Sequence, residues 1–423
     1  MNRGYWPLEN DKENGSYDRP HADVSEEIFS ELYNLVLRRS SANRRQVENA
    51  AATDLNLYHG ASGLAMYFAA YYRASRDARA REVALETISP VHSWIKWQAA
   101  NRQGGQIGKV AMGGLIGFAS CLYGLTNMAD WLNAPELLDT ASLLVGLIHP
   151  QLISADRWLD VMHGSAGTLL ALLAFLQVSR TRGMNPQSAR DLAETCGWHL
   201  LRSRSPTVSA PRGWPRVGGI ALPGFAHGAS GISYALSRLY QETKEEAFYD
   251  GAFEGFAFER TLYIPEQQGW LDPRSNQIME RSSWCDGAPG IALSRLGAVR
   301  SMDDPSLRLD LENALTISRA LPESNNDQLC CGNFGCIDVL HTAGTLLDRL
   351  QLSEHARGMS KRTVERSSAN NFRLLLQTHP PQTSRIDQLR SSLFLGLAGV
   401  GYTLLRLRYP LLLPSILMLE PSE

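Results

Sequence analysis

The stretch His59-Gly-Ala-Ser-Gly63 leads directly into the apolar segment Leu64-Ala-Met-Tyr-Phe68, and this pairing of a glycine motif with an apolar stretch decides the fold. Variants of the motif return along the chain, as at His163-Gly-Ser-Ala-Gly167 and Cys331-Gly-Asn-Phe-Gly335. The first glycines of the seven GxxG units stand at positions 60, 114, 164, 228, 287, 332 and 396, a mean spacing of 56 residues. A repeat of this length accommodates two helices and their connections.

The two halves of each repeat differ in polarity. The stretches after the glycines are apolar nearly all round, which is typical of helices enclosed by others. The segments between them mix charged and apolar residues at helical spacing, as with Ile28, Leu32 and Leu35, and indicate helices exposed on one side. These outer helices are predicted at 25–38, 78–98, 134–147, 188–201, 244–260, 306–320 and 361–376. The sequence therefore predicts an all-α protein, an α/α toroid of seven inner and seven outer helices.

An open solenoid of helical hairpins, in which the glycines serve only as turns, is the alternative architecture. In the closed form, the glycines permit sharp turns and close approach of the backbone where the inner helices begin. The N-termini of the inner helices then converge at one end, where they present unpaired N–H groups and partial positive charge.

Composition bounds the class of protein. The 423 residues include 44% hydrophobic and 20% charged residues, which is ordinary for a globular chain. The net charge of −2 creates no field that would attract nucleic acid. Neither a signal peptide nor a transmembrane segment is recognisable, so we expect a cytoplasmic protein. We expect a polar lead-in at 1–22 that is compatible with disorder, the toroid at 23–410 and a C-terminal tail at 411–423.

Three of the six cysteines indicate a metal site. Cys285, Cys330 and Cys331 fall at corresponding positions of the fifth and sixth motifs, which a closed barrel places side by side. Zinc prefers such thiolates, and three protein ligands with one open position are typical of catalytic zinc. Cys336 is a conceivable fourth ligand, but it lies beyond the glycines on the following helix, where a packed core thiol is the favoured interpretation.

Histidines and charged residues beside the motifs are weaker candidates. His59, His163 and His227 each precede a GxxG unit, where a histidine often only hydrogen-bonds the turn. Asp160 and Arg281 are charged residues next to motifs that either orient a site or lie on the surface. No P-loop, G-x-G-x-x-G or H-E-x-x-H motif is present. The GASG strings lack one residue of a G-x-S-x-G nucleophile elbow, and nothing marks a pair of carboxylates for a glycosidase.

Three motifs together resemble the lanthipeptide cyclases of the LanC superfamily. They are Gly224-Phe-Ala-His-Gly-Ala-Ser-Gly231, Trp284-Cys-Asp-Gly-Ala-Pro-Gly290 and Leu329-Cys-Cys-Gly-Asn-Phe-Gly335. The similarity is greatest to the C-terminal cyclase domain of class II synthetases, whose linker before the first zinc cysteine resembles 257–263 and 269–274. The resemblance covers residues 59–407 and implies an α/α toroid, in agreement with the repeat.

The resemblance also implies roles for individual residues. Cys285, Cys330 and Cys331 match the three zinc ligands, and the last of them replaces the histidine that is commoner in the family. His227 matches the proposed acid/base, and Asp160 and Arg281 match an aspartate and an arginine that line the site. Asp286 stands where tyrosine or histidine is frequent, so no role is carried over to it, and none is carried over to His163.

The function implied by the resemblance is zinc-dependent cyclisation. A cysteine thiolate of a dehydrated precursor peptide, leader plus core, adds to a dehydroalanine or dehydrobutyrine of the same peptide and closes a thioether ring. The chain has no room for a dehydratase region, so we expect separate dehydration enzymes, whether the chain is free-standing or a fragment. Two alternatives stay open: an enzyme that adds glutathione or another small thiol to dehydroamino acids, and a non-catalytic scaffold that retains a structural zinc.

Overall fold

The computed structural model describes residues 26–44, 55–101, 112–206, 211–216, 219–279, 283–324, 326–368 and 390–421. The expected lead-in at 1–22 lies outside the described residues. Within them, seven helices follow the glycine motifs and form the inner layer. They are α2 (Ala61–Ser75), α4 (Phe118–Trp131), α7 (Ser165–Thr181), α9 (Ala229–Thr243), α11 (Ala288–Ala298), α13 (Asn333–Leu346) and α16 (Leu397–Arg408).

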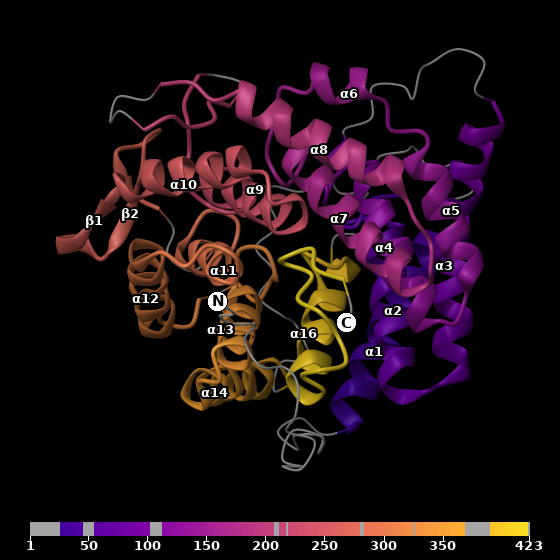
Figure 1. Ribbon diagram of the computed structural model, residues 1–423. Helices are drawn as coiled ribbons and strands as arrows, with labels where there is room; N and C mark the ends of the chain where they lie inside the picture. Colours follow the sequence, from indigo (N-terminus) through magenta and orange to yellow (C-terminus); the bar gives the residue numbers. More distant parts are fainter. Residues whose placement is uncertain are drawn as a thin grey trace, which may run out of the picture.

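The inner helices form a closed ring (Figure 1). Each packs against the next in chain order, from α2 through α4, α7, α9, α11 and α13 to α16, and α16 packs against α2. This last contact confirms the predicted toroid and excludes the open solenoid. The inner helices are buried over most of their surface, as their all-round apolar composition predicts.

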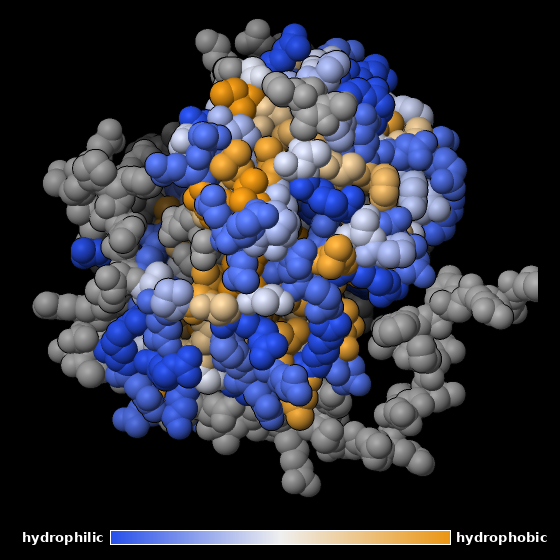
Figure 2. Space-filling view, turned by 90° about the vertical axis from the view of Figure 1, so that its left-hand side faces the viewer, coloured by the Kyte–Doolittle hydropathy of each residue, from blue (hydrophilic) through white to orange (hydrophobic). Residues whose placement is uncertain are grey.

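The outer layer surrounds this ring. Six helices pack on the inner helix that precedes each of them, and α1 packs on α16, so the N-terminal part of the chain fills the seventh outer position. The outer helices are α1 (Glu26–Arg44), α3 (Ala78–Ala100), α5 (Pro135–Val145), α8 (Gln187–Arg202), α10 (Glu246–Arg260), α12 (Pro305–Ala320) and α14 (Leu350–Ser368). The short helix α6 (Pro150–Ala155) packs on α8. Hydrophilic residues cover much of the face shown in Figure 2, with apolar residues visible between them.

The prediction for the last outer helix was wrong in its position. Residues 361–376 were expected to be helical, but α14 begins at Leu350, and residues 369–376 lie outside the described residues. Its buried side chains Leu352, Ala356 and Met359 recur at helical spacing before position 361. These apolar residues are separated by polar ones, which obscured the start of the helix in the sequence.

A small sheet interrupts the helical pattern between α10 and α11. Strands β1 (Tyr263–Ile264), β2 (Gly269–Asp272) and β3 (Gln277–Ile278) pair antiparallel in the order β1-β2-β3, and the 3-10 turn η3 (Pro265–Gln267) connects the first two. Tyr263 pairs with Trp270, whose buried ring anchors the sheet to the toroid. The sheet lies just before the motif that carries Cys285.

Backbone hydrogen bonds join the seven segments that precede the inner helices, which we term the motif turns (55–60, 112–117, 159–164, 222–228, 283–287, 326–332 and 391–396). One N–H of each turn donates to a carbonyl of the next turn around the ring. The bonds are Tyr58 to Leu115 at 3.1 Å, Ile116 to Met162 at 2.9 Å, Met162 to Ala226 at 3.2 Å, Ala226 to Cys285 at 3.0 Å, Trp284 to Cys330 at 3.0 Å, Cys330 to Phe394 at 3.1 Å and Phe394 to Tyr58 at 3.0 Å. The motif turns therefore form a closed circle at one end of the toroid.

The second glycine of most motifs is required by close packing inside its own turn. A Cβ at Gly63 would lie 2.0 Å from the Leu57 carbonyl oxygen, and one at Gly231 would lie 1.9 Å from that of Phe225. The second motif differs from the other six, because its helix begins only after its last glycine, Gly117. Ser120 stands where the other motifs have the second glycine, and its hydroxyl accepts the Leu57 N–H at 3.1 Å.

The C-terminal residues fill the centre of the ring (Figure 1, yellow). Helices on several sides of the ring hold them, because Tyr402 donates to the Pro414 carbonyl at 3.0 Å and Tyr123 donates to the Glu420 carbonyl at 2.7 Å. The Glu420 carboxylate accepts from Arg238 at 2.7 Å. The segment expected as a tail thus packs inside the toroid as far as it is described. None of the described helices is both long and apolar enough to cross a membrane.

The role of the motif glycines can be tested with Gly63→Ala. Because the added methyl group meets backbone, we expect the free energy of unfolding to fall by about 1–3 kcal/mol, as for an overpacked core. Gly358→Ala in α14 is the matched control, since its Cβ meets only the far end of Arg362, and it should be neutral or stabilising by up to about 1 kcal/mol. Urea unfolding measures both. Equal midpoints for the two variants would contradict the packing argument.

Candidate metal centre and active site

Three cysteine side chains meet where the fifth and sixth motif turns lie side by side. Cys331 Sγ lies 3.4 Å from Cys285 Sγ and 3.2 Å from Cys330 Sγ. All three sulfurs lie within 4.8 Å of one another. The hydrogen bond from the Trp284 N–H to the Cys330 carbonyl sets the two turns in register. The structure therefore brings together the three thiols that the sequence analysis placed at corresponding motif positions.

The three sulfurs strongly influence one another's protonation. Hydrogen bonds from Cys285 and Cys330, together with smaller effects, lower the pKa of Cys331 well below its ordinary value. The hydrogen bonds to Cys330 and Cys331, together with burial, raise the pKa of Cys285 well above its ordinary value. One thiolate is thus stabilised by its neighbours, whereas a second negative charge in this buried place requires a cation.

The donor set fits a zinc ion. Thiolates are the ligands that zinc prefers, and on a tetrahedral ion with Zn–S bonds of about 2.3 Å the sulfurs stand about 3.8 Å apart. The observed separations of 3.2 and 3.4 Å need only a small expansion. Ser283 supports the cluster, since its hydroxyl oxygen lies 2.7 Å from Cys285 Sγ. Cys336 lies apart in the core, where its thiol reaches the Ser318 carbonyl at 3.5 Å and burial raises its pKa to about 12.

A second cluster, contributed by the third and fourth motif turns, consists of Asp160, His163 and His227. His227 Nδ1 lies 2.9 Å from Asp160 Oδ2, and the His163 N–H donates to Asp160 Oδ1 at 2.7 Å. Burial alone would raise the pKa of Asp160, but hydrogen bonds from His163 and His227 outweigh it and lower the pKa to about 2. The carboxylate is therefore ionised at neutral pH, and it orients the His227 ring with Nδ1 as the donor.

The two clusters adjoin. The Ala226 N–H donates to the Cys285 carbonyl, and His227 follows directly in the chain. A positive charge on His227 contributes to the lowered pKa of Cys331, which places both groups within electrostatic reach. A carboxylate–imidazole pair thus stands beside a cluster of three thiols at the end of the toroid where the inner helices begin.

The remaining candidate residues from the sequence, His59 and Arg281, are not part of either cluster as described. His59 is bound to its own turn, with its N–H donating to Asn56 Oδ1 at 2.9 Å and its Nε2 lying 3.3 Å from Asn56 Nδ2. Arg281 lies outside the described residues. Arg274, after strand β2, reaches the Asp286 carboxylate at 4.0 Å and so brings a cation near the cysteines.

The sequence reasoning missed Tyr58, which lies within electrostatic reach of Cys330 and Cys331. Its ring stacks on Phe394 at a centroid distance of 5.0 Å. Burial raises its pKa well above the ordinary value. Its position directly before His59 in the first motif was the available signal, but only the closure of the ring shows that the first turn reaches the sixth.

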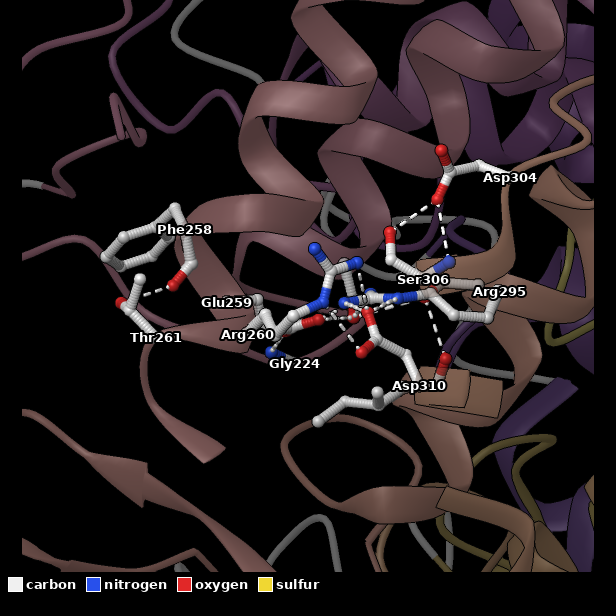
Figure 3. A network of polar contacts seen from close by, with 12 residues as sticks. Gly224, Phe258, Glu259, Arg260, Thr261, Arg295, Asp304, Ser306 and Asp310 are labelled. Atoms are coloured by element: carbon white, nitrogen blue, oxygen red, sulfur yellow. Dashed lines mark hydrogen bonds and ion pairs between the residues drawn. The ribbon is translucent and has the colours of Figure 1, made fainter. Parts of the chain in front are cut away.

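A buried ion-pair network supports the turn that carries His227 (Figure 3). The Glu259 carboxylate accepts the Gly224 N–H at 2.7 Å, the Ser230 hydroxyl at 2.6 Å and Arg295 at 2.5 Å. Gly224 has a φ of +100°, and a Cβ there would lie 2.9 Å from the Cys285 carbonyl oxygen. The network therefore holds the fourth motif turn closely against the fifth.

Comparison with known proteins assigns the chain to a family. The model of the lanthionine synthetase C-like proteins matches residues 51–418, so the chain belongs to this family. The lacticin 481/lactococcin biosynthesis protein LcnDR2 of Lactococcus lactis subsp. lactis is 26% identical over 133 residues, which cover 29% of this chain and only 14% of that protein. Nisin cyclase has a similar fold, with a TM-score of 0.62 and 16% identity over 91% of this chain and 95% of that one.

Removal of the charge on Glu259 tests the buried network. Glu259→Gln leaves the fully buried Arg295 with a weakened set of partners, so we expect the free energy of unfolding to fall by about 3 kcal/mol, the lower end for a broken buried pair. Asp303→Asn is the control, because its pair with Arg308 is exposed, and it should change stability by less than about 0.5 kcal/mol. Urea unfolding at neutral pH measures both, and a Glu259→Gln variant as stable as the control would contradict the role of the network.

Proposed function

We propose that this protein is a zinc-dependent cyclase that forms thioether rings in a dehydrated precursor peptide. A cysteine of the peptide adds to a dehydroalanine or dehydrobutyrine of the same peptide and gives lanthionine or methyllanthionine. The observation that carries the proposal is the juxtaposition of three thiols, a set that leaves one zinc position open, with the Asp160–His227 pair. Membership of the lanthionine synthetase C-like family supports it.

Cys285, Cys330 and Cys331 would hold the zinc ion. When bound, zinc stabilises the thiolate form of the substrate cysteine at neutral pH. A substrate held at the three sulfurs would lie beside the fourth motif turn, since Ala226 and Cys285 are hydrogen-bonded neighbours. Holding nucleophile and alkene in one site converts their encounter into an effectively intramolecular reaction.

His227 is the proposed proton donor. The thiolate sulfur forms a bond to the β-carbon of the dehydro residue, and the electron pair of the double bond moves to the α-carbon and its carbonyl as an enolate. Protonated His227 then transfers a proton from Nε2 to the α-carbon, while Asp160 holds Nδ1 and stabilises the imidazolium. The proton released by the thiol balances the proton gained by the α-carbon, so cyclisation leaves the mass unchanged.

Cationic groups near the site would stabilise the enolate. Arg281 is the residue that the family resemblance suggests, and Arg274 is a described arginine that approaches the turn of Cys285 through its contact with Asp286. The partners of the reaction are a precursor peptide, leader plus core, and separate enzymes that dehydrate its serines and threonines.

Reconstitution tests the function. Incubation of a dehydrated precursor peptide with the protein and zinc should remove free thiol without a change in mass. Cys285→Ala should lose zinc and ring formation, whereas Cys336→Ala, which removes a core thiol, should keep both. A gain equal to the mass of added glutathione would support a small-thiol ligase instead. Bound zinc without reaction would support a scaffold, and zinc and activity in Cys285→Ala would overturn the site.

The proton donor can be tested separately from the metal. His227→Asn should keep one zinc ion per chain and slow ring closure by about 10²–10⁴-fold, the usual contribution of a general acid. Asp160→Asn should also keep zinc and slow the reaction, because it removes the charge that stabilises the imidazolium. Zinc analysis and single-turnover mass spectrometry measure these effects. A His227→Asn variant with the parent rate would exclude His227 as the donor.

A further inference from the structure

One ring nitrogen of His163, Nδ1, is buried without a hydrogen-bond partner among the described residues. The nearest carboxylate atom is Asp160 Oδ2, at 4.0 Å, which is too far for a hydrogen bond. A buried polar atom without a partner is costly, so a nitrogen held in this position points to a ligand.

The surroundings hold His163 and His227 as a matched pair. Their rings are nearly parallel, at 16°, with centroids 5.8 Å apart, and Trp158 packs on the outer side of His163 at 4.8 Å. One ligand atom from each of Asp160, His163 and His227 lies within 4.8 Å of the other two. The Asp160 side chain is only 1% exposed, whereas that of His163 is 25% exposed, so an ion can enter from the side of His163.

We propose that Asp160, His163 and His227 form a second site for a divalent cation, which takes zinc more weakly than the three cysteines do. Two imidazoles and one carboxylate are ligands that zinc accepts, and three of them leave room for water. The ionised Asp160 contributes one negative charge against three at the cysteine cluster. The cysteine site should therefore fill first, and the histidine site only when zinc is in excess.

Occupation of this site would inhibit the enzyme, a consequence that rests on the proposed function. A cation on His227 Nδ1 takes the place of the proton that this nitrogen donates to Asp160. The ring then cannot become an imidazolium, and its remaining N–H is a poor acid at neutral pH. Excess zinc would thus suppress protonation of the enolate and leave the cysteine site intact.

A binding experiment tests the site without any substrate. Protein loaded with one zinc ion is titrated with further zinc by calorimetry, and we expect a second, weaker equivalent. His163→Phe keeps a ring for stacking but lacks the nitrogen, and the second Kd should rise by more than about tenfold, equivalent to about 1.4 kcal/mol. His163→Asn serves if the phenylalanine variant does not fold. His59→Asn is the matched control, because His59 precedes the first motif as His163 precedes the third, and it should keep the second equivalent.

Inhibition provides an independent readout. The rate of each protein is measured relative to its own rate at one zinc ion per chain, and the zinc concentration that halves this rate should be more than about tenfold higher for His163→Phe than for the parent protein. Absence of a second binding event, or equal binding by the parent and His163→Phe, would overturn the site. A second equivalent that leaves the cyclisation rate unchanged would overturn its inhibitory role. If no cyclisation occurs at all, the proposed function fails, but calorimetry still decides whether the site exists.

Discussion

The structure depends on the closed circle of backbone hydrogen bonds between the motif turns. Each turn must approach the next closely enough for an N–H to reach a carbonyl, and the final bond from Phe394 to Tyr58 joins the end of the series to its start. Glycine also lets each turn pack against the start of its own helix, because a Cβ at Gly290 or Gly399 would lie 1.9 Å from a carbonyl oxygen of its own turn. The same geometry places residues from distant parts of the sequence at one end of the toroid. Cys285 and Cys330 meet for this reason, although 45 positions separate them.

The candidate site consists of two clusters with different chemistry. The cysteine cluster collects soft donors and negative charge, whereas the histidine cluster holds one permanent carboxylate beside two imidazoles. Three thiolates would give a bound zinc a net formal charge of about −1, and under the proposed function this charge would favour a reactive substrate sulfur. The contact of His227 with Asp160 joins the third and fourth motif turns, and the His163 N–H bonds to the same carboxylate. Glu259, which is paired with the buried Arg295, also holds the fourth motif turn in place, because its carboxylate accepts the Gly224 N–H.

Much of this arrangement could be predicted from the repeat alone. Equal positions in adjacent motifs become neighbours in a closed ring, so the meeting of Cys285 with Cys330 and Cys331 followed from their register. Contacts between residues that do not recur from motif to motif could not be predicted from the repeat. Glu259 and Arg295 lie on separate helices, and nothing in the sequence shows that they pair. The C-terminal segment was expected as a tail. Its burial depends on hydrogen bonds from Tyr123, Tyr234 and Tyr402 on three separate helices, and no sequence pattern shows these contacts.

The central claim is that Cys285, Cys330 and Cys331 hold one zinc ion whose fourth position is reserved for the substrate sulfur. X-ray absorption spectroscopy of the zinc-loaded protein tests it most directly, before and after addition of a dehydrated peptide that carries a free cysteine. The account predicts three sulfur ligands and one oxygen or nitrogen ligand in the free protein, and four sulfur ligands once the peptide is bound. Four sulfur ligands without the peptide, or a coordination shell dominated by nitrogen and oxygen, would contradict it.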